Sequence, residues 1–272
     1  MLKITIGQYY HAESFIHKLD ARIKLLCTII FITMLFLIGN FIGYGFAAFY
    51  LFVIIRISKV PPRFLLRGLR AIFFIIIFTV VLNVFFTQGG YVLFEIGFVQ
   101  VTAQGLLNAA RMGARLIMLI IGSSMLTLTT TPIQLTDAIE FCLKPLKRIG
   151  VPAHEIAMMM TIALRFIPTL VEEMDKIMKA QMARGASFDT GGLIKRAKSL
   201  VPLLIPLFIS SFRRADDLAL AMESRCYRGD IGRTRMKQMR LNSRDFLALG
   251  FMGMFVSIVF IIEIFAGLWG VL

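Results

Sequence analysis

Four long uncharged apolar runs limit what this chain can fold into more than any other feature. They cover residues 25–55, 71–94, 116–136 and 246–262. Each is long enough to cross a bilayer as a helix, which takes ~20 apolar residues. The first run contains Gly39, Asn40, Gly43 and Gly45, turn-forming residues that allow it to double back as two short spans. These runs predict an all-α integral membrane protein with about five transmembrane helices.

Composition agrees with a membrane protein and excludes several other classes. The 272 residues are 58% hydrophobic and yet have a formal net charge of +14. This combination is not expected of a water-soluble protein with a single core. The basic residues lie beside the apolar runs, and no nucleic-acid-binding motif accompanies them. We therefore expect membrane lipid and acidic protein surfaces as partners, and no nucleic acid.

The positions of Lys and Arg beside the runs predict the orientation, because short cytoplasmic loops hold the excess. The loop at 56–70 has five basic residues and no acid, so we expect it inside, together with the N-terminus. By alternation, residues 87–104 and the C-terminus face outside. The expected domains are an N-terminal membrane domain with four transmembrane helices (1–132), a cytoplasmic domain (133–243) and a C-terminal transmembrane helix (244–272).

Three helices are expected in the cytoplasmic domain, and two of them are long and amphipathic. Between residues 152 and 185, apolar residues recur at steps of three and four, which indicates one apolar helix face. A second long helix is expected from about 193 to 228, and a shorter amphipathic segment at 133–148 precedes both. The charge of the first long helix favours a position along the inner membrane surface over a crossing. Pro168 is expected to bend it.

The two long helices end in similar sequences. Residues 180–185 read AQMARG and residues 221–229 read AMESRCYRG, so Arg184 aligns with Arg225. A cation in the last turn followed by Gly is a common helix ending, because the helix dipole favours the cation and Gly accepts positive φ. Two copies on consecutive helices favour a docking role instead, since a guanidinium stays charged and binds carboxylates bidentately.

The remaining motifs and polar residues predict neither catalysis nor a metal site. The chain lacks a GxxxxGK[ST] phosphate-binding loop, so we do not expect it to hydrolyse ATP alone, and no catalytic residues are predicted. We expect reduced thiols and no metal site, because metal-ligand spacing is missing among Cys27, Cys142, Cys226, His11, His17 and His154. A membrane-embedded enzyme and a self-contained carrier remain alternative functions. The first would show clustered carboxylates or histidines near a membrane face, whereas the acids here are scattered; the second would show inverted repeats and polar residues at mid-membrane.

Near the predicted outer surface, charges and small residues allow more than one interpretation. Arg111, Arg115 and Glu263 either snorkel towards the outer interface or have a partner or function. A stripe of small residues allows close approach of a helix from this chain or from another subunit: Gly105, Ala109 and Gly113.

The sequence resembles the transmembrane coupling subunit (T component) of energy-coupling-factor transporters, ABC-type importers of vitamins and other micronutrients in prokaryotes. The matching segments are SFIHKLDARIKL at 14–25, TTTP at 129–132, RFIP at 165–168 and AQMARG at 180–185. The resemblance implies a multi-pass protein of the prokaryotic cell membrane with three coupling helices in its cytoplasmic domain. It also implies a complex with two ABC-type ATPase subunits, which bind ATP and Mg, and with a substrate-binding membrane protein, the S component. This chain would need no cofactor of its own.

Site residues also follow from the resemblance. In that family an Ala-Arg-Gly triplet ends each of two coupling helices, and each arginine inserts into a groove on one ATPase. Here Ala183, Arg184 and Gly185 match the triplet fully. The second ending, Ser224-Arg225-Cys226, keeps only the arginine, and the neighbouring Arg228 is the alternative second contact.

The implied function is to transmit ATP-driven movement of the two ATPases to the S component. Methionines cluster along the first long helix, either in ordinary core packing or at a surface that accepts several partners, which flexible thioethers suit. Candidates for contact with the S component are therefore Met159, Met160, Ala163, Ile167, Met174 and Met178. A subunit shared among several S components and one dedicated to a single S component are both compatible with the sequence.

Overall fold

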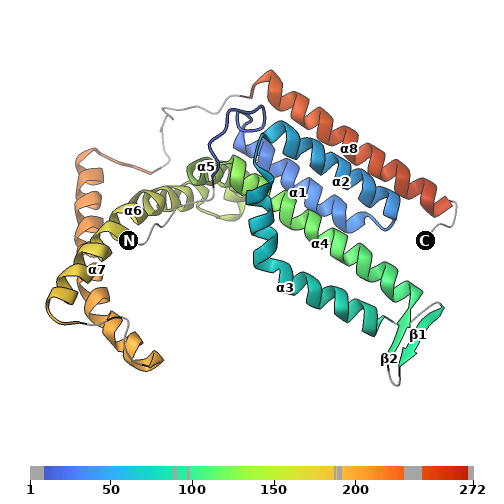
Figure 1. Cartoon of the computed structure of the whole chain (residues 1–272). Coiled ribbons are helices and arrows are strands. Elements are labelled where there is room, and N and C mark those ends of the chain that lie inside the picture. Colours follow the sequence, from blue (N-terminus) through green and yellow to red (C-terminus); the bar gives the residue numbers. More distant parts are fainter. Residues whose placement is uncertain are drawn as a thin grey trace. The chain divides into compact units, whose positions relative to one another are not determined.

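The computed structural model describes residues 9–87, 91–96, 99–186, 188, 192–229 and 241–268, with side chains except at 92–101, 193–197 and 267–268. The described residues form eight α-helices, one 3-10 helix and one antiparallel hairpin (Figure 1). They divide into two compact units. The larger unit contains residues 9–138 and 241–268, and the smaller unit contains residues 139–229.

The larger unit is built from five long helices. These are α1 (Ala21–Leu37), α2 (Phe41–Ser58), α3 (Pro62–Phe86), α4 (Ala103–Thr129) and α8 (Ser243–Leu268). Helix α4 contacts α1, α2 and α3, and α8 contacts α1 and α2. Figure 1 shows α1, α2, α4 and α8 lying along one another as a bundle. A hairpin of β1 (Val92–Ile96) and β2 (Val99–Thr102) lies between α3 and α4.

Aromatic side chains fill the core of the larger unit. Phe31 of α1, Tyr50 of α2 and Phe255 of α8 are all buried. The ring centroids of Tyr50 and Phe255 are 4.3 Å apart, and those of Phe31 and Phe255 are 5.8 Å apart. On α4, a Cβ added at Gly122 would lie 2.8 Å from the Phe31 ring. A residue without a side chain is therefore needed where α4 passes the aromatic core.

The small-residue stripe of α4 meets a helix of the same chain. An added Cβ at Gly113 would lie 3.2 Å from Val80 of α3, and one at Gly105 would lie 3.1 Å from the carbonyl oxygen of Val84. Ala109 lies between them and is fully buried. Small residues thus allow α3 and α4 to approach closely, as they do between membrane helices generally.

Among the described residues, five helices are long and apolar enough to span a bilayer, which confirms an all-α membrane protein. These are α2, α3, α4, α8 and α6 (Ala153–Ala183). Helix α1, predicted as a span, has only 17 residues. Helix α6, predicted to lie along the inner surface, reaches the length and hydropathy of a span because five of its seven charged residues lie together at 172–179, which leaves its first part nearly uncharged.

Two boundaries differ from the predicted spans. The apolar run at 71–94 does not stay helical: α3 ends at Phe86, and Val92–Ile96 pair as strand β1. Likewise the run at 116–136 is interrupted, since α4 ends at Thr129, Thr130 is extended and α5 (Pro132–Leu143) begins at Pro132. Apolar character alone does not distinguish a helix from a strand or a turn, which explains both errors.

The smaller unit contains the C-terminal part of α5, the 3-10 helix η1 (Lys144–Ile149), α6 and α7 (Leu193–Ser224). The division between the two units falls inside α5, between Ala138 and Ile139. Helices α6 and α7 pack against one another. Pro168 lies inside α6 and Pro202 and Pro206 lie inside α7, and both helices continue past them. The predicted series of one short and two long helices is therefore present.

Candidate functional site

Helix α6 ends in a Schellman motif with Arg184 at the C-cap. The N–H of Gly185 donates to the carbonyl of Met182 at 3.0 Å, and the N–H of Ala186 donates to that of Gln181 at 3.0 Å. Arg184 itself has φ −86° and ψ 8°, and Gly185 has φ +88°. This pair of hydrogen bonds, closed by a left-handed residue, satisfies carbonyls that a helix end otherwise leaves unpaired.

Helix α7 repeats this ending residue by residue. The N–H of Cys226 donates to Glu223 at 2.8 Å, and the N–H of Tyr227 donates to Met222 at 3.1 Å. Arg225 has φ −91° and ψ 11°, close to the values of Arg184. The left-handed position, occupied by Gly185 in α6, is occupied here by Cys226 with φ +55°. Arg225 is therefore the backbone equivalent of Arg184, and Arg228 has no counterpart in the motif.

The side chains at both endings face solvent. Ala183, Arg184, Ser224, Arg225 and Arg228 are all exposed. Within the described residues, the guanidinium groups of Arg184 and Arg225 make no ion pair. Two unpaired cations, each held at a helix C-cap, can bind carboxylates of another protein without first breaking a contact of their own.

A polar contact joins the middle of α6 to α7. The Glu173 carboxylate forms a 2.6 Å ion pair with Arg214 and also accepts a hydrogen bond from Ser210. Both charged side chains are partly buried, so solvent screens this pair less than a fully exposed one. The contact fixes the register in which the two helices pack.

Two further contacts connect the ends of these helices to their neighbours. The Tyr227 hydroxyl, just beyond the Arg225 ending, lies 3.0 Å from Sδ of Met158 on α6. Nδ1 of His154 lies 3.2 Å from Oε1 of Glu140, which joins the start of α6 to α5. The Arg225 ending is thus attached to the first turns of α6 rather than left free.

The predicted contact residues for an S component divide into two groups. Met159, Ala163 and Ile167 follow one another at four-residue steps and are exposed, and Met160 beside them is exposed as well. They form a stripe on α6 that we call the 159–167 stripe, comprising these four residues. Met174 and Met178 are only partly exposed.

Two of the three charges predicted near the outer surface, Arg115 and Glu263, have hydrogen-bond partners within the chain. Nε of Arg115 donates to the Tyr44 hydroxyl at 2.9 Å, and its Nη2 donates to the carbonyl of Ile38 at 3.2 Å. The Glu263 carboxylate accepts from the N–H of Gly39 at 3.0 Å and from the side chain of Asn40 at 3.1 Å. Arg115 and Glu263 therefore hold the turn between α1 and α2. Of the two expected roles, a charge with a partner fits them better than snorkelling towards the outer interface.

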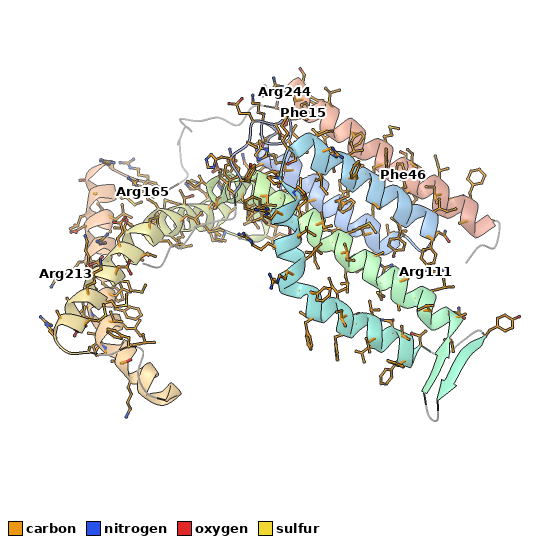
Figure 2. All side chains as sticks on the ribbon, in the orientation of Figure 1. Phe15, Phe46, Arg111, Arg165, Arg213 and Arg244 are labelled. Carbon is orange, nitrogen blue, oxygen red and sulfur yellow. The ribbon has the colours of Figure 1, made fainter. Side chains whose placement is uncertain are left out.

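Arg111 differs from these two charges. It lies on α4 towards the end that carries the hairpin (Figure 2). Its guanidinium lies 5.1 Å from the centroid of the Phe41 ring, a cation–π contact. Its Nε is buried and has no hydrogen-bond partner among the described residues.

Sequence reasoning missed a second polar cluster, at the opposite end of the larger unit. Nζ of the buried Lys24 donates to the carbonyl of Thr129 at 2.8 Å and to that of His17 at 3.2 Å. Asp245, 2% exposed, accepts from the N–H of Asp20 at 2.9 Å. The only available signal was a Lys and an Asp placed directly at the edges of apolar runs.

His17 belongs to the segment that precedes α1 and is held on both ring nitrogens. Nδ1 lies 2.7 Å from Oγ of Ser14, and Nε2 lies 2.9 Å from the carbonyl of Tyr10. Burial lowers the pKa of His17 below its usual value, and the charge of Lys24 acts in the same direction, while the hydrogen bond to Tyr10 opposes them. The neutral imidazole, donating from Nε2 and accepting at Nδ1, fits these contacts.

No metal centre or disulfide is evident in the part of the chain that the structure describes. No group of three or more His, Cys, Asp or Glu is placed to hold a metal ion there. Cys27, Cys142 and Cys226 are free thiols.

These features define a multi-pass membrane protein that carries a separate helical unit with two matching, arginine-capped helix ends. Residues 12–238 match the family model described as "CbiQ: Cobalt transport protein". The "Energy-coupling factor transporter transmembrane protein EcfT" of Clostridium kluyveri is 58% identical over 246 residues, which are 90% of this chain and 91% of the relative. The protein of the same name from Thermosediminibacter oceani is 58% identical over 248 residues (91% and 93%), and that from Listeria innocua serovar 6a is 46% identical over 245 residues (90% and 92%). The chain belongs to this family and is an EcfT transmembrane component of energy-coupling-factor transporters.

Proposed function

We propose that this chain transmits ATP-driven movement of two ABC-type ATPase subunits to an S component that binds a vitamin or another micronutrient. Arg184 and Arg225 are the two docking residues, each for one ATPase. The chain itself is non-catalytic, and ATP with Mg is bound by the partners. The membrane domains at 1–132 and 244–272, the cytoplasmic domain at 133–243, a cytoplasmic N-terminus and an external C-terminus belong to the same proposal.

The matching helix endings carry this proposal. A Schellman motif fixes the backbone around its C-cap residue, so the side chains of Arg184 and Arg225 leave their helices in equivalent directions. Two equivalent projecting cations suit two equivalent acidic grooves on a pair of related subunits. Arg228, three residues further along, lacks this placement, which supports Arg225 as the second docking residue.

Transmission requires that the two endings do not move independently. The Glu173–Arg214 ion pair joins α6 to α7, and the Tyr227–Met158 contact attaches the end of α7 to α6. Movement of an ATPase at either arginine would therefore act on the packed pair of helices. The exposed 159–167 stripe on α6 is the surface that we assign to the S component, with Met174 and Met178 at its margin.

Charge reversal at the two arginines tests the docking residues. In cells that produce the complete complex, Arg184→Glu and Arg225→Glu are each expected to reduce co-purification of the ATPases, and the double variant is expected to abolish it. Each introduced carboxylate would face the acidic groove of an ATPase, so repulsion would replace attraction at both contacts. Arg228→Glu is the matched control, since it has the same charge change three residues from Arg225 but lies outside the Schellman motif.

The readout is the amount of each ATPase recovered with a tagged EcfT chain, alongside membrane insertion of the variant. Normal recovery of both ATPases with the double variant would refute the docking assignment. A loss of recovery with Arg228→Glu but not with Arg225→Glu would move the second contact to Arg228.

A further inference from the structure

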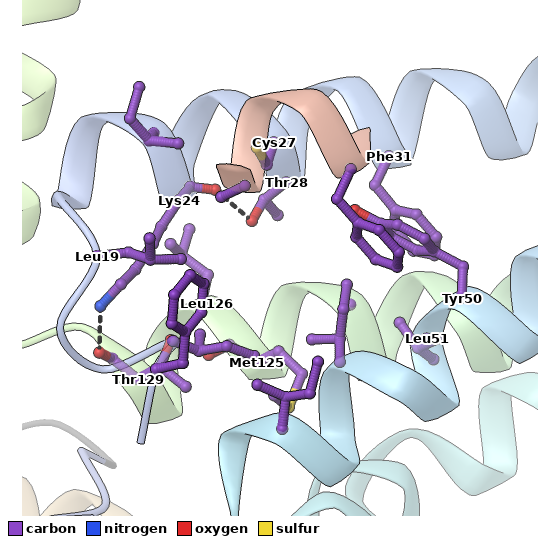
Figure 3. Close-up of a pocket in the computed structure, with 18 of the residues that line it drawn as sticks. Leu19, Lys24, Cys27, Thr28, Phe31, Tyr50, Leu51, Met125, Leu126 and Thr129 are labelled. Carbon is purple, nitrogen blue, oxygen red and sulfur yellow. Dashed lines mark hydrogen bonds between the residues drawn. The ribbon is translucent and has the colours of Figure 1, made fainter. Parts of the chain in front are cut away.

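A cavity of about 310 Å³ lies inside the larger unit, between α1, α2, α4 and α8 (Figure 3). The segment before α1 closes one end of the cavity with Leu19, next to Lys24. At the other end, Phe31 and Tyr50 form an aromatic wall with ring centroids 5.9 Å apart. Its volume is within the usual range of small-ligand sites. None of its lining residues belongs to the docking sites at Arg184 and Arg225.

The polar groups along its wall are already occupied. Nζ of Lys24 donates to two carbonyls, as described above, and Oγ1 of Thr28 donates to the carbonyl of Lys24 at 2.8 Å. The Tyr50 hydroxyl lies 3.1 Å from Sδ of Met252. The remaining lining is almost entirely aliphatic and aromatic, for example Leu51, Met125 and Leu126. A polar ligand would lose its hydration here without gaining hydrogen bonds, so the wall selects an apolar ligand.

The cavity is elongated along the helices. Its lining follows α1 from Ile23 to Phe31 and α4 from Thr129 back to Gly122. Seven or eight residues at ~1.5 Å rise correspond to a length of roughly 10–12 Å. In a membrane-spanning bundle, such a slot runs in the same direction as the lipid acyl chains around it. A membrane also supplies acyl chains at very high local concentration.

The end of the cavity near Lys24 carries exposed basic residues. Lys59 lies two positions after the lining residue Ile57, and Arg244 lies three positions before the lining residue Leu247; both are exposed. Figure 2 shows Arg244 at the same end of the larger unit as Phe15, another lining residue. The nearby Asp245 carboxylate is buried and accepts two backbone hydrogen bonds, from Asp20 and Asn242. The charge that faces an approaching headgroup is therefore positive.

We propose that this cavity binds one acyl chain of an anionic phospholipid, with the headgroup beside Lys59 and Arg244. The chain would occupy the slot between α1, α2 and α4 as far as the Phe31–Tyr50 wall. The bound lipid would be a structural part of the larger unit and not a transported substrate.

Cavity filling tests this site directly. Ala248 lines the cavity from α8, and Ala248→Leu places three more carbon atoms in it. Gly250→Leu is the matched control on the same helix, because an added Cβ at Gly250 meets nothing within 4 Å. The purified full-length chain in detergent would be titrated with dioleoyl phosphatidylglycerol and followed by native mass spectrometry. We expect a 1:1 adduct with the wild-type chain and with Gly250→Leu, and a loss of about tenfold or more with Ala248→Leu.

Equal adducts in all three proteins, or no 1:1 adduct in any of them, would overturn the site. Phosphatidylcholine is expected to bind at least about fivefold more weakly than phosphatidylglycerol, because it lacks the net charge. Equal binding of the two lipids, or tighter binding of free oleate, would overturn the role of the phospholipid headgroup.

A second measurement does not depend on the folding of a filled variant. With Cys142→Ser and Cys226→Ser, the lining residue Cys27 is the remaining thiol of the chain. Phosphatidylglycerol is expected to slow its alkylation by an apolar maleimide about tenfold, and the same concentration of phosphatidylcholine is expected to slow it less. An alkylation rate that phosphatidylglycerol leaves unchanged would contradict occupation of the cavity.

Discussion

The backbone N–H of Asp20 donates a 2.9 Å hydrogen bond to Oδ1 of Asp245, which joins residues 225 positions apart in the sequence. The second carboxylate oxygen of Asp245 accepts from the N–H of Asn242 at 2.8 Å. One buried side chain thus holds the start of α8 and the start of α1 together. It also reaches back to the residue before its own helix, as the acidic partner of a capping box does.

Removing this carboxylate should destabilise the larger unit. Asp245→Ala leaves two backbone N–H groups without their acceptor, which is expected to cost about 1–3 kcal/mol per buried donor. The measurement is the thermal unfolding temperature of the purified chain in detergent. Arg244→Ala, an exposed neighbour, should change that temperature little; equal effects of the two substitutions would show that the carboxylate has no special role.

The left-handed residue at the end of α7 provides a second prediction. Cys226 has φ +55°, where a residue with a Cβ is disfavoured by about 1 kcal/mol relative to Gly. Cys226→Gly should therefore slow hydrogen exchange at the helix end while leaving ATPase recovery unchanged. Ser224→Gly, in the last helical turn, should have the opposite effect, because Gly costs about 0.5–1 kcal/mol inside a helix. Faster exchange in Cys226→Gly would contradict the assigned backbone conformation.

A pair of glycines tests the packing of α4 against the aromatic core. An added Cβ at Gly122 would lie 2.8 Å from the Phe31 ring, whereas one at Gly45 would meet nothing within 4 Å. Gly122→Ala is expected to destabilise the chain by about 1–3 kcal/mol through overpacking. Gly45→Ala should have no such cost and is the matched control. Thermal unfolding of both variants distinguishes them, and a tolerated Gly122→Ala would mean that α1 and α4 can separate.

The segment before α1 should make stability dependent on pH. The pKa of His17 is lowered from 6.5 mainly by burial, so the folded chain binds fewer protons than the unfolded chain just below that pH. Stability is therefore full above about pH 6.5 and declines as the pH falls through and below that value. The unfolding temperature should drop between about pH 7.5 and 5.5, and drop less in His17→Gln. The same substitution at the exposed His11 should change the pH dependence less, because His11 is the smallest of the causes that lower the pKa of His17.

The sequence predicted features that depend on local pattern and missed those that depend on distant partners. The apolar runs, the turn at Gly39 and Asn40, and the alignment of Arg184 with Arg225 could all be read from neighbouring residues. The hairpin could not, because strand β1 lies inside an apolar run that also suits a helix. The partner of Glu263 lies more than 200 residues away, so no local pattern indicates it.

The choice between Arg225 and Arg228 shows the same limit at a smaller scale. Both are exposed arginines in the same short segment. The alignment favours the first of them, and the hydrogen bonds of Cys226 and Tyr227 show that its backbone is equivalent to that of Arg184. Whether that equivalence serves ATPase docking is what the charge-reversal variants decide.

The contacts of the larger unit also have a consequence for its synthesis. Helices α1, α2 and α3 have their main helical contacts with α4 and α8 rather than with one another. Helices α4 and α8 follow α1, α2 and α3 in the sequence, so these partners leave the ribosome later. Each of these early helices must at first stay in the bilayer through its own hydrophobicity, and α3, in which only Leu65 and Ile76 are buried, suits that condition best. The bundle can close around its aromatic core only when α8, the last helix, has been inserted, so truncation before α8 should leave inserted but unassembled helices.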